Sequence, residues 1–313
     1  MTPRRTRLAP SPTGALHLGN ARTFLVTWAM ARRAGWDLVY RCEDLDGPRV
    51  KPEAVAAAVT DLRWLGIDWD EDAGCQSEDP EPYLAAIRRL ADDGWIFRCD
   101  RSRREIEAAA SAPHAGEHEV RFPEAFRPPA GDAAWRFAGP EHAHRLRVDP
   151  GPRTVDDACA GRVTVDVSAE VGDFLVWTRQ GVPAYQLAVV VDDARHRITD
   201  VVRGDDLLPS AARQAILHER LGQPEPRWWH LPLVVGPDGR RLAKRHGDSR
   251  VASYRDAGVP AERIVGWVAW TCRQQPERRP MTAAAFRDRF DPAAMPRDRI
   301  TFTEEDHRWL LDA

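Results

Sequence analysis

The chain has 313 residues, a length typical of two or three packed domains, and 43% of them are hydrophobic, which is enough for a large core. No apolar run approaches the ~20 residues of a membrane span, so we expect no membrane segment. Five cysteines are scattered without closely spaced pairs, which argues against a disulfide scaffold and favours a reducing, cytoplasmic location. The formal net charge is −3, so a nucleic-acid partner would have to meet a local basic patch.

Residues 10–20, Pro-Ser-Pro-Thr-Gly-Ala-Leu-His-Leu-Gly-Asn, lie between a short apolar run and residues 21–34, whose apolar side chains recur at helical spacing. This pattern predicts a turn that leaves a strand and enters a helix N-terminus, where unpaired N–H groups and the helix dipole suit phosphate. Gly14 and Gly19 leave room for a ligand to approach the backbone, and His17 adds a donor that titrates near pH 7. The alternative is a connection rich in Pro and Gly with one surface histidine.

The next segments alternate between strands and helices. Residues 38–42 predict a buried strand that ends in Glu43 and further acidic residues. Since ligands of parallel α/β sheets bind at the carboxyl ends of strands, Glu43 is placed to meet a cation, although a solvated acidic turn is the alternative. Residues 51–65 and 82–93 predict helices ended by glycine, and residues 95–98 predict a third strand. The alternation favours a doubly wound parallel sheet.

From Cys99 onward the pattern changes, because residues 111–153 are rich in Pro, Gly, Ala and His and show no period. We interpret this region as an insertion in the sheet domain. The α/β pattern returns at residues 185–192, which we interpret as a strongly buried strand ending in two aspartates. The other predicted elements are strands at 6–9, 163–167, 174–178, 198–202 and 228–235, and helices at 210–221, 251–257, 260–271 and 282–290.

Lysine is rare in this chain, since only two of its 45 Lys and Arg residues are lysines. A lysine kept against such a bias suggests a site that needs a compact ammonium group. Lys51 opens a helix-like segment and resembles a surface residue. Lys244 lies in a polar loop bounded by glycines, residues 239–247, and is the stronger functional candidate.

Three ordered motifs resemble the catalytic half of class I glutamyl-tRNA synthetases. His-Leu-Gly-Asn at 17–20 corresponds to the HIGH motif of that class, and Arg-Leu-Ala-Lys-Arg at 241–245 corresponds to its KMSKS motif; Val-Arg-Gly-Asp-Asp at 202–206 lies between them. The resemblance covers roughly residues 4–250. It implies an α/β fold: a Rossmann-like, doubly wound parallel sheet with an inserted α+β subdomain and a short C-terminal helical domain.

The resemblance implies that L-glutamate is activated with ATP and Mg²⁺. A glutamate carboxylate would attack the α-phosphate of ATP and displace pyrophosphate, while the protein supplies positioning and charge stabilisation. The implied catalytic residues are His17, Asn20 and Lys244, and Lys244 would neutralise charge on the leaving pyrophosphate. The implied ATP-binding residues are Pro10, Gly14, His17, Gly19, Asn20, Arg241 and Lys244.

The resemblance also implies a glutamate pocket. Glu43 would pair with the substrate α-amino group, and Arg7 and Arg203 would bind the side-chain carboxylate. Two arginines at one site would favour glutamate over uncharged glutamine. Tyr185 matches this pocket, with a core aromatic as the alternative. The implied pocket residues are Arg7, Ala9, Ser11, Glu43, Tyr185 and Arg203.

Only about sixty residues follow the Lys244 loop, too few for the anticodon-binding domain of the larger synthetases. The chain is therefore more similar to a shorter family, the glutamyl-queuosine tRNA(Asp) synthetases, which activate glutamate without tRNA and transfer it to the queuosine base of the tRNA(Asp) anticodon. Its expected partner is queuosine-containing tRNA(Asp). One alternative is a truncated or discrete glutamyl-tRNA synthetase that acts at the tRNA 3′ end. Another is a non-catalytic relative, although the retained His17, Glu43, Arg203 and Lys244 argue against it. We expect a monomer.

The shorter family often carries a zinc site that includes a Cys-x-Cys pair. Here Cys99 matches the first position, but Arg101 stands at the second, so we expect no structural zinc and no other metal ligands. A site formed by Cys99, His114 and His118 with a carboxylate is the alternative. The expected domains are the catalytic halves at 1–98 and 185–248, an inserted acceptor-binding-like subdomain at 99–184, and a helical stem-contact domain at 249–313, with no anticodon-binding domain.

Overall fold

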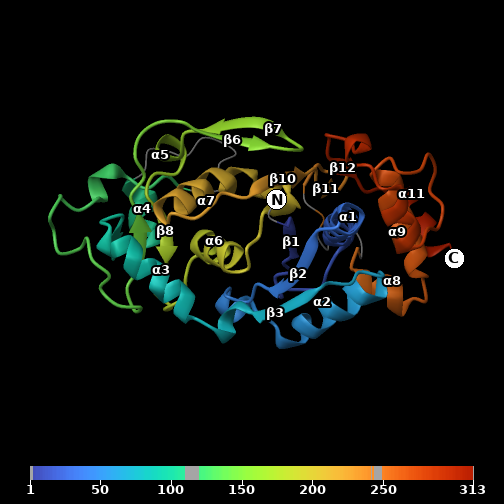
Figure 1. The fold of residues 1–313 in the computed structure, drawn as a ribbon, viewed down its shortest axis with the longest axis horizontal. Coiled ribbons are helices and arrows are strands. Elements are labelled where there is room, and N and C mark those ends of the chain that lie inside the picture. Colours follow the sequence, from blue (N-terminus) through green and yellow to red (C-terminus); the bar gives the residue numbers. More distant parts are fainter. Residues whose placement is uncertain (1–2, 110–119, 241, 243–248, 313) are drawn as a thin grey trace.

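A parallel β-sheet in two halves forms the centre of the molecule (Figure 1). The computed structural model describes residues 3–109, 120–240, 242 and 249–312. In one half β2 pairs in parallel with β1 and with β3, and in the other half β9 pairs in parallel with β10. The halves meet where β9 lies beside β1, and there the Thr199 N–H donates to the Arg5 carbonyl oxygen at 2.9 Å. The strands are β1 (Arg5–Leu8), β2 (Asp37–Cys42), β3 (Glu71–Cys75), β9 (Asp200–Gly204) and β10 (Arg227–Leu231).

Alternate residues of the central strands face two different hydrophobic cores, as expected for a sheet covered on both sides. Leu38 and Val202 belong to the core that includes α1, whereas Val39 and Val201 belong to the core that includes α3, α6 and α7. The doubly wound α/β fold predicted from the sequence is therefore confirmed. The helices around the sheet are α1 (Leu18–Ala34), α2 (Pro52–Trp64), α3 (Glu81–Asp92), α6 (Tyr185–Arg195) and α7 (Leu208–Arg220).

One strand predicted for the parallel sheet lies elsewhere. β4 (Ile96–Arg98) pairs antiparallel with β5 (His144–Leu146), which in turn pairs with β8 (Phe174–Trp177). The strand that follows β2 in the parallel sheet is β3, whose sequence is Glu-Asp-Ala-Gly-Cys. Strand β3 was not predicted, because its side chains are half-buried or exposed and it therefore lacks an apolar run.

The run at 185–192 is the second error, since it forms helix α6 rather than a strand. Its apolar residues from Leu187 to Val191 are at most 5% exposed, because protein surrounds this helix on most sides. A short run that is apolar on every face carries no period, so its sequence cannot distinguish a buried strand from a buried helix.

The remaining elements lie at the two ends of the long axis and along one side of the sheet (Figure 1). A hairpin of β6 and β7 joins the edge of the sheet through β6, which pairs with β10. None of the helices in the described residues has the length and apolar composition needed to cross a membrane. These elements are α4 (Arg103–Ala109), β6 (Arg153–Asp157), β7 (Gly161–Val165), α5 (Val167–Glu170), β11 (Val234–Val235), α8 (Val251–Asp256), α9 (Ala261–Thr271), α10 (Ala283–Arg289), β12 (Ile300–Thr301) and α11 (Glu304–Leu311).

Candidate active site

A cavity of about 700 Å³ opens at the carboxyl ends of β1 and β9. This is the point where the two halves of the sheet meet, and in open α/β sheets such a switch point is where ligands bind. The cavity brings together every predicted site residue that the structure describes. These are Arg7, Ala9, Pro10, Ser11, Gly14, His17, Gly19, Asn20, Glu43, Tyr185 and Arg203. Arg241 and Lys244 lie outside the described residues.

His17 caps the helix that leads away from the cavity. Its Nδ1 accepts the backbone N–H groups of Gly19 at 3.1 Å and Asn20 at 3.4 Å, and the Asn20 side-chain oxygen accepts the His17 N–H at 3.2 Å. Because Nδ1 is an acceptor here, the proton of the neutral ring lies on Nε2. The N–H groups of Gly19 and Asn20, which the helix N-terminus was predicted to present to phosphate, therefore donate to the His17 ring in this structure. A side chain on Gly19 would collide with that ring, since its Cβ would lie 2.9 Å from His17 Cε1.

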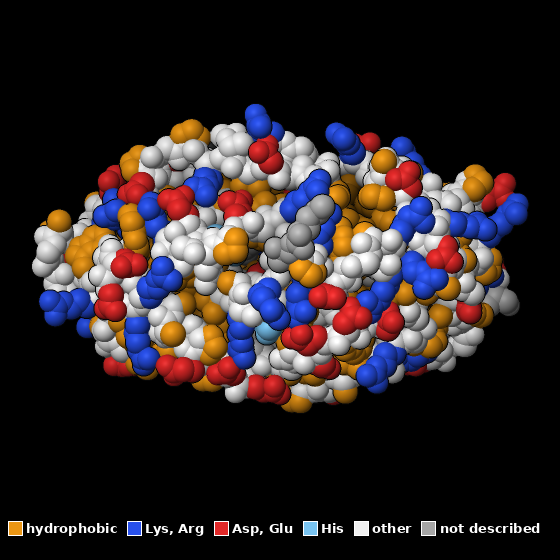
Figure 2. Space-filling view, viewed as in Figure 1, with side chains coloured by type: hydrophobic (Ala, Val, Ile, Leu, Met, Phe, Trp, Pro, Cys, Tyr) orange, Lys and Arg blue, Asp and Glu red, His pale blue; other side chains and the backbone are white. Residues whose placement is uncertain are grey.

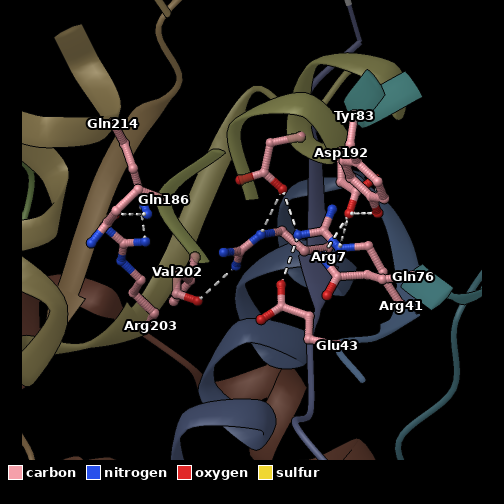
Figure 3. Close-up of polar contacts among 11 residues, drawn as sticks. Arg7, Arg41, Glu43, Gln76, Tyr83, Gln186, Asp192, Val202, Arg203 and Gln214 are labelled. Carbon is pink, nitrogen blue, oxygen red and sulfur yellow. Dashed lines mark hydrogen bonds and ion pairs between the residues drawn. The ribbon is translucent and has the colours of Figure 1, made fainter. Parts of the chain in front are cut away.

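Arg7 and Arg41 share one buried carboxylate behind the cavity wall (Figure 3). Asp193 Oδ1 lies 3.1 Å from Arg7 Nε and 2.8 Å from Arg41 Nη2, and all three side chains are at most 4% exposed. Burial alone would raise the pKa of Asp193, but the two guanidinium groups bring it below its ordinary value. Arg7 also donates to the Val202 carbonyl oxygen at 3.3 Å. Much of the Arg7 charge is thus balanced inside the protein.

Glu43 follows β2 at the edge of the cavity, where the sequence placed it. Its side chain is 13% exposed and accepts a hydrogen bond from Arg41 Nη2 at 3.0 Å. Burial raises the pKa of Glu43, while Arg41 and Arg7 act in the opposite direction. The carboxylate is placed to meet a cationic group from the cavity.

Arg203 differs from Arg7 because, among the described residues, it donates only to neutral acceptors. Nε donates to His230 Nε2 at 2.9 Å, Nη1 to Gln214 Oε1 at 2.8 Å and Nη2 to the Leu207 carbonyl oxygen at 3.3 Å. Arg203 is 5% exposed, and burial lowers its pKa, yet a guanidinium stays protonated in proteins. A buried cation without a bonded counter-ion favours an anion from the cavity.

Tyr185 begins α6 and lines the cavity with 40% of its surface exposed. The alternative that Tyr185 is a core aromatic is therefore wrong. Desolvation of its hydroxyl by the surrounding protein raises the pKa of Tyr185, whereas the charge of Arg203 acts in the opposite direction.

Several residues that hold the site together were missed by the sequence analysis. Asp192 accepts hydrogen bonds from Gln76 at 2.7 Å and from Tyr83 at 2.9 Å behind the cavity wall (Figure 3). Arg41 could have been found, since it is a charged residue inside an apolar strand and such residues are seldom buried without a partner. His230 could have been found in the same way, since it is a polar residue inside strand β10.

No group of three or more potential metal ligands occurs among the residues that the structure describes. Cys99 is buried in a small core with Phe97, Ile106 and Phe122. His114 and His118 fall outside the described range. The absence of structural zinc stays a prediction, which elemental analysis of the purified protein would test.

Residues 4–296 match the family described as tRNA synthetases class I (E and Q), catalytic domain. The chain therefore belongs to this family of class I synthetases, which are ligases that use ATP. A glutamyl-Q tRNA(Asp) synthetase from Rhodopirellula baltica is 47% identical over 84% of this chain and 83% of its own length. A protein of the same name from Symbiobacterium thermophilum is 42% identical over 96% of both chains. These relatives confirm the family predicted from the motifs.

Other similar proteins are longer. A glutamate--tRNA ligase from Caulobacter sp. is 40% identical over 84% of this chain but over only 55% of its own length. The solved glutamate-tRNA synthetase of Elizabethkingia anophelis superposes on 98% of this chain and 70% of its own with a TM-score of 0.80 and 24% identity. This structural likeness confirms the fold.

Proposed function

We propose that this protein activates L-glutamate with ATP and transfers it to the queuosine base in the anticodon of tRNA(Asp). The charge arrangement of the cavity is the observation that supports activation of L-glutamate. Arg203 offers a buried cation without a bonded counter-ion among the described residues, and Glu43 offers a carboxylate. An amino acid with an anionic side chain and a cationic α-amino group complements both.

ATP would lie at the start of α1, beside Pro10, Gly14, His17, Gly19 and Asn20, with Mg²⁺ on its phosphates. The substrate α-carboxylate would attack the α-phosphorus, the bond to the β-phosphate would break, and pyrophosphate would leave. Lys244 and Arg241 are proposed to stabilise that leaving group. A queuosine hydroxyl would then attack the acyl carbon of glutamyl-adenylate and release AMP.

The choice of acceptor is supported by the relatives at 40–47% identity, which are named glutamyl-Q tRNA(Asp) synthetases. Lys/Arg and Asp/Glu side chains are interspersed on the face shown in Figure 2, rather than gathered into one basic field. We propose that arginines of the C-terminal segment contact phosphates of a single stem-loop, which would position the tRNA without reading its sequence. These are Arg287, Arg289, Arg297, Arg299 and Arg308.

A second candidate is charging of a tRNA 3′ end, because glutamate--tRNA ligases are 37–40% identical over 84–90% of this chain. One experiment separates the two. The protein is incubated with labelled glutamate, ATP and an isolated tRNA(Asp) anticodon stem-loop, with or without queuosine. We expect label only on the queuosine-containing stem-loop, and pyrophosphate exchange without any tRNA. An unlabelled stem-loop together with tRNA(Glu) charged at its 3′ end would favour the second candidate.

The division into residues 1–98, 99–184, 185–248 and 249–313, without an anticodon-binding domain, stays a proposal. The monomeric state and the cytoplasmic location are also proposals, and sedimentation of the purified protein would test the first of them.

A further inference from the structure

His230 lies between Arg203 and a buried carboxylate. Its Nε2 accepts from Arg203 Nε at 2.9 Å, and its Nδ1 lies 2.6 Å from Asp157 Oδ2. The side chains of His230 and Asp157 have no exposed surface. Asp157 also accepts the backbone N–H groups of Cys159 and Ala160 at 2.8 and 2.7 Å. These donors, together with His230, hold the pKa of Asp157 below its ordinary value despite burial, so this carboxylate is ionised.

These contacts select one form of the His230 ring. A guanidinium can only donate, so Nε2 must carry a lone pair, and an ionised carboxylate can only accept, so Nδ1 must carry the proton. His230 is therefore neutral. Burial lowers its pKa, and the charges of Arg203 and Arg7 act in the same direction, whereas Asp157 acts in the opposite one.

Because this acceptor is neutral, it does not balance the charge of the Arg203 guanidinium. A carboxylate in contact with Arg203 would form an internal ion pair and cancel much of the guanidinium field. Asp157 is instead separated from Arg203 by the width of an imidazole ring. The hydrogen bond orients Arg203 while leaving its charge available to the cavity.

We infer that the Asp157–His230 pair is a positioning pair for amino-acid selection: it holds the Arg203 guanidinium toward the cavity through a neutral acceptor, so that the side-chain carboxylate of the bound substrate supplies the counter-charge. The inference rests on the proposed function. The nearby carboxylates of Asp193 and Glu43 act on Arg203 through space. Without the bond to His230, Arg203 can turn toward them and lose the orientation that selects an anionic side chain.

Two amide substitutions test this role, because they differ by one methylene group. In His230→Gln the amide oxygen reaches the position of Nε2 and can still accept from Arg203. In His230→Asn the shorter amide can bond to Asp157 but does not reach Arg203. Glutamate-dependent pyrophosphate exchange is measured while glutamate and ATP are varied separately, and glutamine is tested as a competing substrate.

We expect His230→Asn to raise KM for glutamate about ten- to hundredfold, since it removes a hydrogen bond to a charged group, and to weaken discrimination against glutamine. The KM for ATP is expected to change less than about twofold, and His230→Gln is expected to recover most of the glutamate affinity. The control is His144→Leu. His144 is also fully buried and accepts one backbone hydrogen bond, but its strand does not line the cavity.

Equal KM values for glutamate in the Asn and Gln variants, or parallel increases for glutamate and ATP, would overturn the inference. If His230→Asn fails to fold, Asp157→Asn carries the test. It places a donor opposite Nδ1, moves the ring proton to Nε2 and breaks the bond to Arg203 with His230 still present; an unchanged glutamate KM there would also overturn the inference. Wild-type protein without glutamate-dependent exchange would refute the proposed function itself, whereas active wild type with indifferent variants would refute only the positioning role.

Discussion

The family resemblance predicts the same role for Arg7 and Arg203, yet their surroundings differ. Arg7 shares the Asp193 carboxylate with Arg41, whereas Arg203 donates only to neutral groups among the described residues. Both arginines could be predicted as site residues from the sequence, because each stands in a recognisable motif. Their bonding partners could not be predicted from the sequence, because Asp193, Gln214 and His230 come from elements far apart in the chain.

This difference predicts distinct effects of substitution. Arg203→Gln is expected to raise KM for glutamate roughly a hundredfold or more, since about 3 kcal/mol of charge-assisted binding is lost, and to reduce the preference for glutamate over glutamine. Arg7→Gln is expected to lower the unfolding temperature as well, because it leaves Asp193 with one buried partner fewer. Pyrophosphate exchange and thermal unfolding measure these effects. Arg220→Gln, outside the cavity, is the control, and a larger glutamate defect in Arg7→Gln than in Arg203→Gln would contradict the assignment.

Gly19 supports a second prediction at the residue scale. A Cβ there would lie 2.9 Å from Cε1 and 3.0 Å from Nδ1 of His17, so Gly19→Ala must push the ring off the helix start. We expect a stability loss of about 1 kcal/mol from the lost cap and a higher KM for ATP. Gly14→Ala is the informative comparison, since a Cβ there meets no protein atom within 4 Å and any effect would arise from the bound nucleotide. Unchanged stability and ATP affinity in Gly19→Ala would refute this reading of the cap.

At the scale of elements, α6 shows why the sequence analysis failed where it did. Residues 187–191 are apolar on every side of the helix, so the period that distinguishes helix from strand is absent. Strand β3 was not predicted for the opposite reason, since it has almost no apolar residues that would indicate a strand. By contrast α1 was predicted because Phe24, Leu25, Trp28 and Ala29 recur at helical spacing, although every residue from Phe24 to Ala31 is buried. Gly35 ends the helix in the left-handed region, at φ 67°.

The C-terminal part of α6 carries a prediction of its own. Asp192 accepts from Gln76 and Tyr83 in the protein interior. Asp192→Asn replaces one acceptor oxygen by a donor, so we expect a stability loss of about 2 kcal/mol. Asp79→Asn is the matched control, because Asp79 pairs with Arg195 of the same helix at the surface, where a change below about 0.5 kcal/mol is expected. Chemical denaturation of the three proteins measures both, and equal losses in the two variants would contradict the buried role of Asp192.

For the whole molecule, the sequence predicted the fold class and most elements, since these depend on local patterns. It did not predict which strands join which sheet, as the position of β4 shows, because pairing depends on contacts between distant segments. The predicted site residues that the structure describes nevertheless line one cavity. Strand ends in a parallel sheet converge on one edge, so motifs that follow strands meet there without knowledge of the strand order.

The whole protein should also be sensitive to mild acid. Burial lowers the pKa of His144 to about 4, and its Nε2 accepts the Ala138 N–H at 3.1 Å, a bond that protonation would break. Burial likewise lowers the pKa values of His196, His218 and His230.

The sign of the effect follows from proton uptake. An unfolded histidine has a pKa near 6.5, so as the pH falls below that value the unfolded chain binds protons that the native protein excludes, and stability is lost until the native groups also titrate. For His144 alone the loss at pH 5 is about 2 kcal/mol. The raised pKa values of Glu43 and Asp61 act in the opposite direction. Thermal unfolding of wild type and His144→Gln between pH 7.5 and pH 5 isolates the contribution of His144. We expect the wild-type midpoint to fall more steeply, and parallel curves for the two proteins would show that His144 is not the group that senses acid.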